Sequence, residues 1–512
     1  MSLHVVSRSV ANRVERAVAG RIDTDVVVVG TGAGGAVSGT EFARAGRRVV
    51  FLETGGAFGK KDLSKRSLAW SLTKLWSSKG TQTSSSLPVT LVPSGRVVGG
   101  STVLNSAICF KPPEHRLQEW MANTGSSVWD PKYLGPVVDE IWERIGVAPT
   151  HAGNGRKNNL LFEKGCAALG YKHAWMNRNA PGCVGCGVCV LGCPSGGKAS
   201  VDKSILPEAV DLGARIITRA RAREIIIEGG RATGVVADVL DPETEHVIGE
   251  LTVRADLVIV AGGGLFSPLL LKQSGLDSEH CGKHLAIHPG IAVFGEFAEP
   301  VLMWDGVPQG YYAYAPDDDH CLLETANAGP GELAALLCKP GDYASIARLK
   351  HLTMAGAMIR DSGSGEVDVQ IDNGILRPKF TMKFTDRDLL AFRNGAKATV
   401  RAWFAAGAKR VAPGVQPLEF FDDEATAFAK IDTLTSGEFL SQPYGSHPHG
   451  TCRMGPKTGP HAGVVDENAQ VHGVRRLYVM DGSIFPTTLG VNPQVTIMST
   501  ALSLARRTLA ST

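Results

Sequence analysis

The feature that most constrains the fold of this chain is a strand, a glycine-rich turn, a helix and a second strand that follow one another near the N-terminus. Residues 25–29 end in four consecutive valines, a pattern typical of a parallel strand buried on both faces. Gly30, Gly32 and Gly35 then form the pattern G-x-G-x-x-G. The first glycine allows a tight turn, the second lets a pyrophosphate approach the backbone, and the third permits close packing of helix on strand. The segment therefore predicts a βαβ unit that binds a dinucleotide at the start of a helix.

The continuation of this unit supports the same interpretation. The pattern predicts a helix over residues 33–45 and a strand over residues 47–51, which ends close to Glu53. A carboxylate at this place can accept hydrogen bonds from a ribose diol. The prediction depends on the order of these elements, because glycine-rich turns are common in a chain with 60 glycines. Residues 255–267 predict a further parallel strand with a glycine turn, and residues 216–249 predict hairpin strands. The unit by itself does not distinguish FAD from NAD.

Composition and charge exclude several classes of protein. A hydrophobic content of 43%, a charged content of 20% and a net charge of +3 are ordinary for a soluble enzyme and indicate neither disorder nor nucleic-acid binding. The N-terminal residues contain no secretory or twin-arginine signal, so we expect a cytoplasmic enzyme. Val10, Val14 and Val18 recur at helical spacing and predict a docked N-terminal helix. No apolar stretch has the length of a membrane-spanning helix, so we expect that any contact with a membrane is peripheral.

Four of the ten cysteines are crowded into eleven residues. Cys183, Cys186, Cys189 and Cys193 form C-x2-C-x2-C-x3-C-P with glycines between them, which is the spacing of a bacterial ferredoxin segment. Zinc sites more often use two separated cysteine pairs, and disulfides across two-residue gaps have poor geometry. The spacing therefore predicts an iron–sulfur cluster, with structural thiols or zinc as the alternatives. The first three cysteines suit a 3Fe-4S centre, whereas Cys193 or a distant cysteine would complete a 4Fe-4S centre.

Two more blocks carry a pattern that extends over the chain. The first is GRVVGGSTVLN at residues 95–105, where paired glycines suit backbone lying against a large ligand and Asn105 can bond a polar ring edge. The second begins with HPHGTCRMG at residue 447 and runs to LYVMDGSIFPTTLGVNPQVTI. Together with ADLVIVAGGGLFSPLLL and CGKHLAIHP, these blocks resemble the glucose–methanol–choline (GMC) oxidoreductase family, in the order and at the spacing of that family. The resemblance is loose only at residues 290–441, and it is strongest to cholesterol oxidases and long-chain alcohol oxidases.

The resemblance implies both a fold and a cofactor. The expected fold is an α/β FAD-binding domain of the Rossmann type plus an α+β substrate domain with an antiparallel sheet. The expected division of the chain gives FAD binding residues 1–180 and 201–289, the iron–sulfur segment residues 181–200, the substrate domain residues 290–440, and FAD binding with catalysis residues 441–512. Some family members attach the flavin through a histidine, where this chain has Leu104, so we expect FAD to be bound noncovalently.

The resemblance also assigns site residues. The residues expected to contact FAD are Gly30, Gly32, Gly35, Glu53, Gly100, Asn105, Ala222, Asp481, Gly482, Gln494 and Val495. The expected catalytic pair is His447 and Asn492. Oxidation of an alcohol needs a group that removes the hydroxyl proton and another that orients the oxygen, while the carbon-bound hydrogen passes to flavin N5. An imidazole suits the first task and a carboxamide the second, which gives His447 the role of base. His449 is expected to be a bystander or a gate.

The sequence also predicts the partners of the reaction. Trp304, Tyr311, Tyr312 and Tyr314 favour an apolar pocket, so we expect a hydrophobic small-molecule alcohol as substrate. An iron–sulfur cluster would relay electrons singly to a quinone or another one-electron acceptor, which makes the enzyme a dehydrogenase. Without a cluster, dioxygen is the simplest acceptor and the enzyme is an alcohol or sterol oxidase. A lyase that retains FAD without redox use of it is a further alternative.

Overall fold

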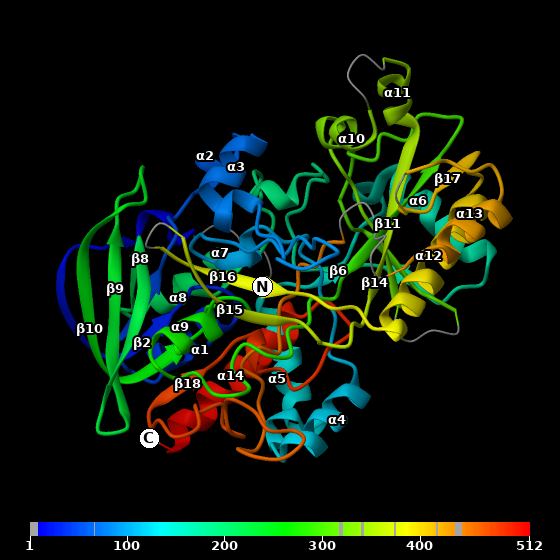
Figure 1. Cartoon of the computed structure of the whole chain (residues 1–512). Helices are drawn as coiled ribbons and strands as arrows, with labels where there is room; N and C mark the ends of the chain where they lie inside the picture. Colours follow the sequence, from blue (N-terminus) through cyan, green and yellow to red (C-terminus); the bar gives the residue numbers. More distant parts are fainter. Residues whose placement is uncertain are drawn as a thin grey trace.

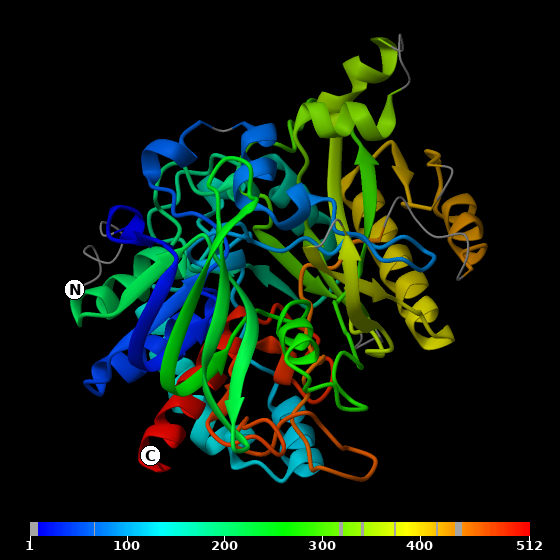
Figure 2. The ribbon, with the colours of Figure 1, turned by 60° about the vertical axis from the view of Figure 1, so that its left-hand side comes forward.

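The computed structural model describes residues 9–65, 67–316, 321–338, 343–372, 375–415, 418–435 and 443–511. Two sheets organise these residues, and each forms the centre of one lobe in Figures 1 and 2. The first sheet has eight strands in the order β1-β7-β3-β2-β10-β9-β8, with β18 also paired to β10. Its strands are β1 (Glu15–Arg16), β2 (Gly20–Val29), β3 (Val49–Glu53), β7 (Arg215–Thr218), β8 (Ala220–Glu228), β9 (Arg231–Leu240), β10 (Val247–Val260) and β18 (Leu477–Val479).

The predicted dinucleotide unit is confirmed as β2, α1 (Ala33–Arg44) and β3. β2 pairs in parallel with β3 on one side and with β10 on the other, and Val26, Val27 and Val28 are almost fully buried. Burial on both faces explains the uninterrupted valine run. β8 and β9 form the predicted antiparallel hairpin, and the end of β10 supplies the further parallel strand.

The predicted N-terminal helix is wrong. Residues 10–12 form a single 3₁₀ turn, and the chain then enters β1, which pairs in parallel with β7 at the edge of the first sheet. Val18, placed by the pattern on the buried face, is 70% exposed. Pairing with a distant strand has overridden the local helical spacing.

The second sheet is antiparallel, as expected, with the order β17-β11-β14-β13-β12-β5. Its strands are β5 (His173–Trp175), β11 (Gly290–Glu296), β12 (Tyr311–Tyr314), β13 (Cys321–Thr325), β14 (Leu352–Ile359) and β17 (Arg410–Ala412). β5 comes from the part of the chain that the sequence assigned to FAD binding, and so does α6 (Ala152–Ala168), which packs on α12 (Asp386–Ala406) through Phe162 and Trp403. The second lobe therefore recruits residues before position 180.

Shorter elements surround the two sheets. The remaining helices are α2 (Lys60–Leu63), α3 (Leu68–Leu75), α4 (Glu114–Thr124), α5 (Pro131–Arg144), α7 (Val201–Ser204), α8 (Leu206–Asp211), α9 (Ser267–Gln273), α10 (Pro330–Leu337), α11 (Tyr343–Arg348), α13 (Glu424–Asp432) and α14 (Gln494–Ser511). Two small two-stranded sheets pair β4 (Ala148–Pro149) with β6 (Asn177–Arg178), and β15 (Glu366–Asp372) with β16 (Ile375–Thr381). Within the described part of the chain, no helix is both long and apolar enough to cross a membrane.

Candidate active site

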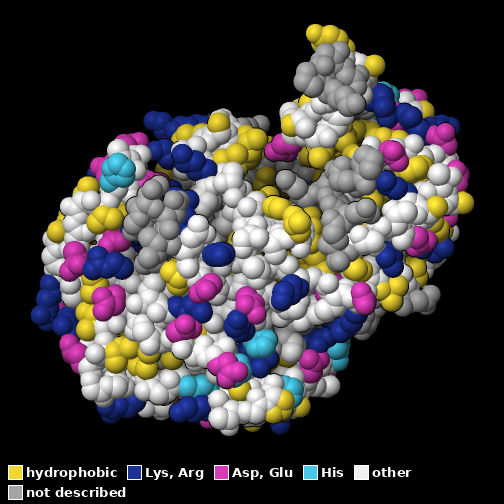
Figure 3. Space-filling view, in the orientation of Figure 1, with side chains coloured by type: hydrophobic (Ala, Val, Ile, Leu, Met, Phe, Trp, Pro, Cys, Tyr) yellow, Lys and Arg dark blue, Asp and Glu magenta, His cyan; other side chains and the backbone are white. Residues whose placement is uncertain are grey.

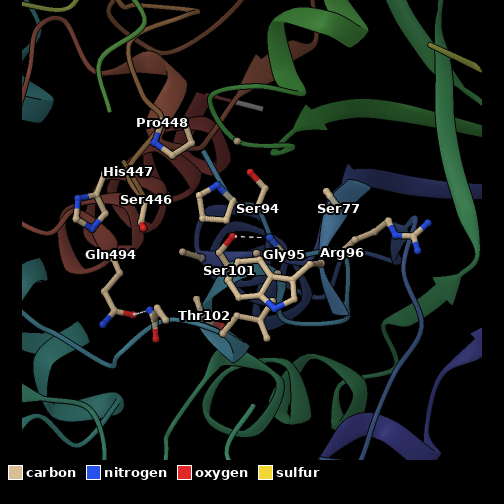
Figure 4. Close-up of a pocket in the computed structure, with 18 of the residues that line it drawn as sticks. Ser77, Ser94, Gly95, Arg96, Ser101, Thr102, Ser446, His447, Pro448 and Gln494 are labelled. Atoms are coloured by element: carbon tan, nitrogen blue, oxygen red, sulfur yellow. Dashed lines mark hydrogen bonds between the residues drawn. The ribbon is translucent and has the colours of Figure 1, made fainter. Parts of the chain in front are cut away.

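A large cavity connects the two sheets. Its volume is about 930 Å³, and it runs from the turn after β2 to the face of the second sheet formed by β11, β13 and β14. The molecular surface is hollowed between the two lobes (Figure 3). Ser446, His447 and Gln494 lie on one side of this cavity, and Ser94, Gly95, Arg96 and Ser101 lie across from them (Figure 4). The turn that binds a dinucleotide and the residues predicted to be catalytic therefore share one space.

Glycine is needed in the turn after β2 for two different reasons. A Cβ on Gly30 would overlap the carbonyl oxygen of Ala261, and a Cβ on Gly35 would overlap the carbonyl oxygen of Gly30. A Cβ on Gly34 would overlap the carbonyl oxygen of Met480. A Cβ on Gly32, at the N-terminus of α1, would meet nothing within 4 Å. The first three are required by packing, whereas Gly32 borders open space into which a pyrophosphate fits at the start of a helix.

Glu53 lies at the end of β3, where the sequence predicts a ribose contact. One carboxylate oxygen accepts hydrogen bonds from the hydroxyl of Thr31 at 2.5 Å and the amide of Thr31 at 3.3 Å. The other accepts from the amide of Gly55 at 2.9 Å. Burial raises the pKa of Glu53, against the opposing effect of these hydrogen bonds. The carboxyl group lines the cavity and is held rigidly for contact with a ligand.

The loop 95–105 and the start of α14 are joined to each other. The Asn105 side chain donates to the side-chain oxygen of Gln494 at 2.9 Å, and Gln494 donates to the carbonyl of Ile108 at 2.6 Å. Asp481 accepts from the amide of Gly263 at 2.8 Å and from the hydroxyl of Ser267 at 2.5 Å. These bonds bring segments from distant parts of the sequence together around one wall of the cavity. The wall has room for a flavin beside backbone that it could contact.

Nine of the eleven predicted FAD contacts line this cavity. They are Gly30, Gly32, Glu53, Gly100, Asn105, Ala222, Asp481, Gly482 and Gln494. Gly35 and Val495 lie behind the wall, where Gly35 serves the packing of α1 and Val495 is fully buried in the core. The residues present therefore fit a bound FAD, with Gly35 and Val495 in supporting positions.

His447 and Asn492 meet at the catalytic end of the cavity. The side-chain nitrogen of Asn492 lies 3.4 Å from His447 Nε2, and both residues line the cavity. Burial, and to a lesser extent the neighbouring His449, lowers the pKa of His447 to about 3, so its imidazole is neutral. The Oδ1 atom of Asn492 is buried and has no partner. The structure brings together the two residues that the sequence selected, 45 positions apart.

His449 is not among the residues that line the cavity. Its Nδ1 lies 2.6 Å from the carbonyl oxygen of His447, so that nitrogen donates to the backbone. The residue is fully buried, and its ring packs against Phe485 and His288.

Sequence reasoning missed two further residues of this wall. His288 is 2% exposed, and its Nδ1 lies 3.3 Å from Nδ1 of His447. Glu324, on β13, is 6% exposed and also lines the cavity. One signal for Glu324 was available, since it is the single acid in the buried run Cys321–Thr325. His288 lies in the block CGKHLAIHP, which was recognised without a role for this residue.

Glu324 is a buried acid beside the catalytic pair. One carboxyl oxygen accepts from the Gln309 side chain at 3.1 Å, and the other is buried without a partner. Burial raises the pKa of Glu324 to about 8, although a hydrogen bond with the Asn492 side chain opposes this shift. Both protonation states of the Glu324 carboxyl group are therefore populated at neutral to mildly alkaline pH.

The four cysteines of residues 183–193 do not converge on a common point. The guanidinium of Arg178 donates to Sγ of Cys183 at 3.6 Å and to Sγ of Cys189 at 3.2 Å. Sγ of Cys193 instead accepts from the amide of Lys198 at 3.3 Å. Nowhere in the described ranges do three or more histidine, cysteine or acidic side chains form a group that could hold a metal ion. In this arrangement the residues do not fit the predicted cluster. Cys186, Gly187, Val188, Val190 and Leu191 line the cavity instead.

The aromatic residues predicted to meet the substrate are mostly elsewhere. Trp304 lines the cavity. Tyr311 is buried in the core of the second lobe against Trp175, and Tyr312 packs on Phe110 and Tyr314. The apolar lining comes from other residues, namely Ile291, Ala292, Ala326, Met354 and Met358.

Comparisons with known proteins agree with this geometry. Models of the GMC oxidoreductase family match residues 25–290 and 362–501. An uncharacterized GMC-type oxidoreductase of Mycobacterium tuberculosis is 33% identical over 95% of this chain and 76% of its own length. A long-chain-alcohol oxidase of Arabidopsis thaliana is 30% identical over 95% of this chain and 67% of its own length.

Two more similar proteins are a cholesterol oxidase and a solved structure. The cholesterol oxidase of Acinetobacter baumannii is 24% identical over 94% of this chain and 93% of its own length. Pyridoxine 4-oxidase from Mesorbium loti has the same fold, with a TM-score of 0.74 at 19% identity over 95% of this chain and 99% of that one. The chain belongs to the GMC oxidoreductase family and is an FAD-dependent oxidoreductase.

Proposed function

We propose that the chain oxidises a hydrophobic alcohol to a carbonyl compound, with FAD as the hydride acceptor. The observation that carries the proposal is the contact between His447 and Asn492 in the wall of a cavity whose other end holds the dinucleotide turn. An alcohol bound at this contact would lie between the two polar side chains and the space suited to a flavin. Bound FAD would supply the electron sink, taking up the carbon-bound hydrogen as hydride.

The residues of this chain provide binding, orientation and proton transfer. His447 and Asn492 would hold the alcohol oxygen by hydrogen bonds, and a basic group of the same wall would take its proton, for which the sequence predicts His447. The loop 95–105 and α14, joined through Asn105 and Gln494, would fix the flavin against the catalytic wall. Noncovalent attachment is part of the proposal, because Leu104 is buried and offers no nucleophile.

The substrate class follows from the rest of the lining. Ala292, Met354 and Met358 of the second sheet line the cavity, so burial of an apolar substrate body would be favourable there. The names of two relatives, a long-chain-alcohol oxidase and a cholesterol oxidase, agree with an apolar alcohol.

Dioxygen is the electron acceptor that we propose. The cysteine spacing predicts an electron relay through an iron–sulfur cluster. The described residues offer no group of side chains that could hold such a cluster, and Arg178 donates to two of the four sulfurs. Iron and acid-labile sulfide, measured in anaerobically purified protein, test this choice. Stoichiometric amounts of both would restore the relay to a quinone or another one-electron acceptor. Their absence, with hydrogen peroxide formed during turnover, would support the oxidase.

Anaerobic reduction of the flavin tests the function itself. The holoenzyme is mixed with a panel of sterols, fatty alcohols and terpenoid alcohols, and bleaching of the flavin absorbance is followed. Alcohol oxidation predicts bleaching by at least one class, whereas a non-redox lyase predicts none. The variant His447→Ala should retain FAD and bleach more slowly than the wild type. Bleaching at the wild-type rate by this variant would refute a catalytic role for His447.

A further inference from the structure

The backbone around His288 is held in an unusual conformation. His288 has a φ of 49°, in the left-handed region that non-glycine residues seldom adopt. The carboxyl group of Asp361 accepts the amide hydrogens of both Ile287 and His288, at 3.2 Å and 3.1 Å. These two bonds fix the backbone so that the His288 ring points between the chain near Gly490 and His447. Strain held at a buried position of a catalytic wall points to a functional reason for the ring placement.

The contacts of the His288 ring determine where its proton lies. The backbone amide of Gly490 donates to His288 Nε2 at 2.9 Å. An amide N–H can only donate, so His288 Nε2 must be the acceptor and cannot itself carry a proton. Burial and the neighbouring histidines lower the pKa of His288 well below its ordinary value, so the ring is neutral and has one proton. That proton is on Nδ1, 3.3 Å from Nδ1 of His447.

We propose that His288 is a positioning residue for His447. The Gly490 amide fixes the proton of His288 on Nδ1, and His288 in turn keeps the proton of His447 on Nε2. His288 Nδ1–H donates to His447 Nδ1, which must then be an acceptor. A neutral His447 has its single proton on the opposite nitrogen, facing Asn492 and the cavity. A half-turn of the Asn492 carboxamide would bring its unpartnered Oδ1 opposite this N–H and satisfy both groups.

This arrangement, which rests on the proposed function, changes the role of His447. A neutral imidazole that already carries a proton on Nε2 donates a hydrogen bond to the alcohol oxygen and does not take its proton. The group that accepts it is Glu324 in its ionised form, which is the minor form at neutral pH; Glu324 lines the same cavity and accepts a hydrogen bond from Gln309. The O–H bond breaks with its proton moving to a Glu324 oxygen. The carbon-bound hydrogen leaves as hydride with the electron pair that FAD takes up, and the products are a carbonyl compound and a neutral Glu324.

The position of the His447 proton can be observed directly. Holoenzyme with nitrogen-15-labelled histidine gives different nitrogen shifts for the protonated and the unprotonated ring nitrogen, and the His447 signals are identified by their loss in His447→Gln. The proposal predicts the proton of His447 on Nε2. A proton on Nδ1 in the wild-type holoenzyme would overturn it, and this outcome needs no variant of His288 to fold.

Two variants of His288 separate its two hydrogen bonds. His288→Asn keeps an N–H at the place of Nδ1 and suits the left-handed backbone, whereas His288→Gln keeps an acceptor near Nε2 but no donor near His447. We expect the His447 proton to stay on Nε2 in His288→Asn. In His288→Gln we expect it to be shared between Nδ1 and Nε2. The same tautomer in both variants as in the wild type would assign His288 a purely structural role and overturn the proposal.

Flavin reduction by an alcohol separates the donor from the base. His447→Gln retains a donor and lacks a base, so its rate of anaerobic flavin reduction should exceed that of His447→Ala by about ten-fold, the worth of one hydrogen bond. Glu324→Gln should reduce the rate by about 10²- to 10⁴-fold. Equal rates for the two His447 variants, with a wild-type rate for Glu324→Gln, would overturn the assignment. If no alcohol bleaches the wild-type flavin, the proposed function fails instead, and the nitrogen shifts still test the tautomer.

Discussion

Replacement of Glu324 by glutamine should change how the stability of the protein depends on pH. Burial raises the pKa of Glu324 in the fold to about 8, against 4.5 for an ordinary glutamate. Each unit of difference corresponds to about 1.4 kcal/mol. Between these two pH values the unfolded chain has released the proton and the folded protein has kept it. Raising the pH across this window therefore favours unfolding, by a total of about 5 kcal/mol for this group. Glu324→Gln has the same shape without the titration, so it should lack this loss.

The assay compares apoprotein melting temperatures across pH 5 to 9 for the wild type, Glu324→Gln and a control. The exposed residue Glu279 offers the control Glu279→Gln. Asp361, whose pKa burial raises to about 7, gives the wild type and both variants a shared loss of stability as the pH rises towards 7. The contribution of Glu324 is the difference between the curves. Infrared spectra provide a second readout, because the carbonyl band of a neutral buried carboxyl group should be present at neutral pH and absent in Glu324→Gln.

Two results would refute this reasoning. Parallel melting curves for the wild type and Glu324→Gln from pH 5 to 9 would mean that Glu324 titrates as an ordinary glutamate. An infrared band of Glu324 that disappears near pH 4.5 would give the same answer. Either result would show that water or an unrecognised partner reaches the carboxyl oxygen that has no partner in the structure.

Three further predictions follow from other parts of the site. Gly34→Ala should lower the melting temperature of the apoprotein, because its Cβ overlaps the carbonyl oxygen of Met480. Gly32→Ala has open space around its Cβ, so it should weaken FAD binding and leave the melting temperature unchanged. Thermal melting measures the first effect and equilibrium dialysis of FAD the second. Arg178→Met should destabilise the protein by about 1–3 kcal/mol, since it removes the donor of the Cys189 sulfur and of the Ser106 carbonyl, and an unchanged melting temperature would contradict this. Stability should also fall as the pH drops below about 6.5, because burial lowers the pKa of His447 to about 3 and only the unfolded chain binds that proton; His447→Gln should show a smaller acid loss.

The sequence predicts best those parts of the fold that local patterns encode. The valine run, the glycine turn and the following helix are contiguous, and each is held by its neighbours in the chain, so β2, α1 and β3 appear where they were expected. β5 was not predicted, because its three residues become a strand only through pairing with β12. The N-terminal helix was predicted wrongly for a related reason, since β7 offers those residues a strand partner about 200 positions away.

The candidate site was predictable only where the family pattern carries it. His447 and Asn492 were found by resemblance, and the structure places them in contact. His288 and Glu324 were missed, because their roles depend on which atoms face them in the fold. The Gly490 amide decides the tautomer of His288, yet the two residues are 202 positions apart. The cysteine spacing predicted a cluster that the structure does not support. Spacing alone gives no information about the directions of the sulfurs or about Arg178, which donates to two of them.

Burial between the two sheets favours the neutral form of five titratable groups in and around the catalytic wall. It lowers the pKa of His288, His447 and His449, and it raises the pKa of Glu324 and Asp361. A proton released by the substrate moves to the group that binds protons most strongly. The pKa of Glu324, about 8, exceeds that of His447, about 3, so the minor ionised form of Glu324 is the stronger base of the two. Desolvation makes the His447 imidazole a weak base and keeps it neutral, so it can act as a hydrogen-bond donor. This role agrees with the proton on Nε2 that we infer from the contacts of His288.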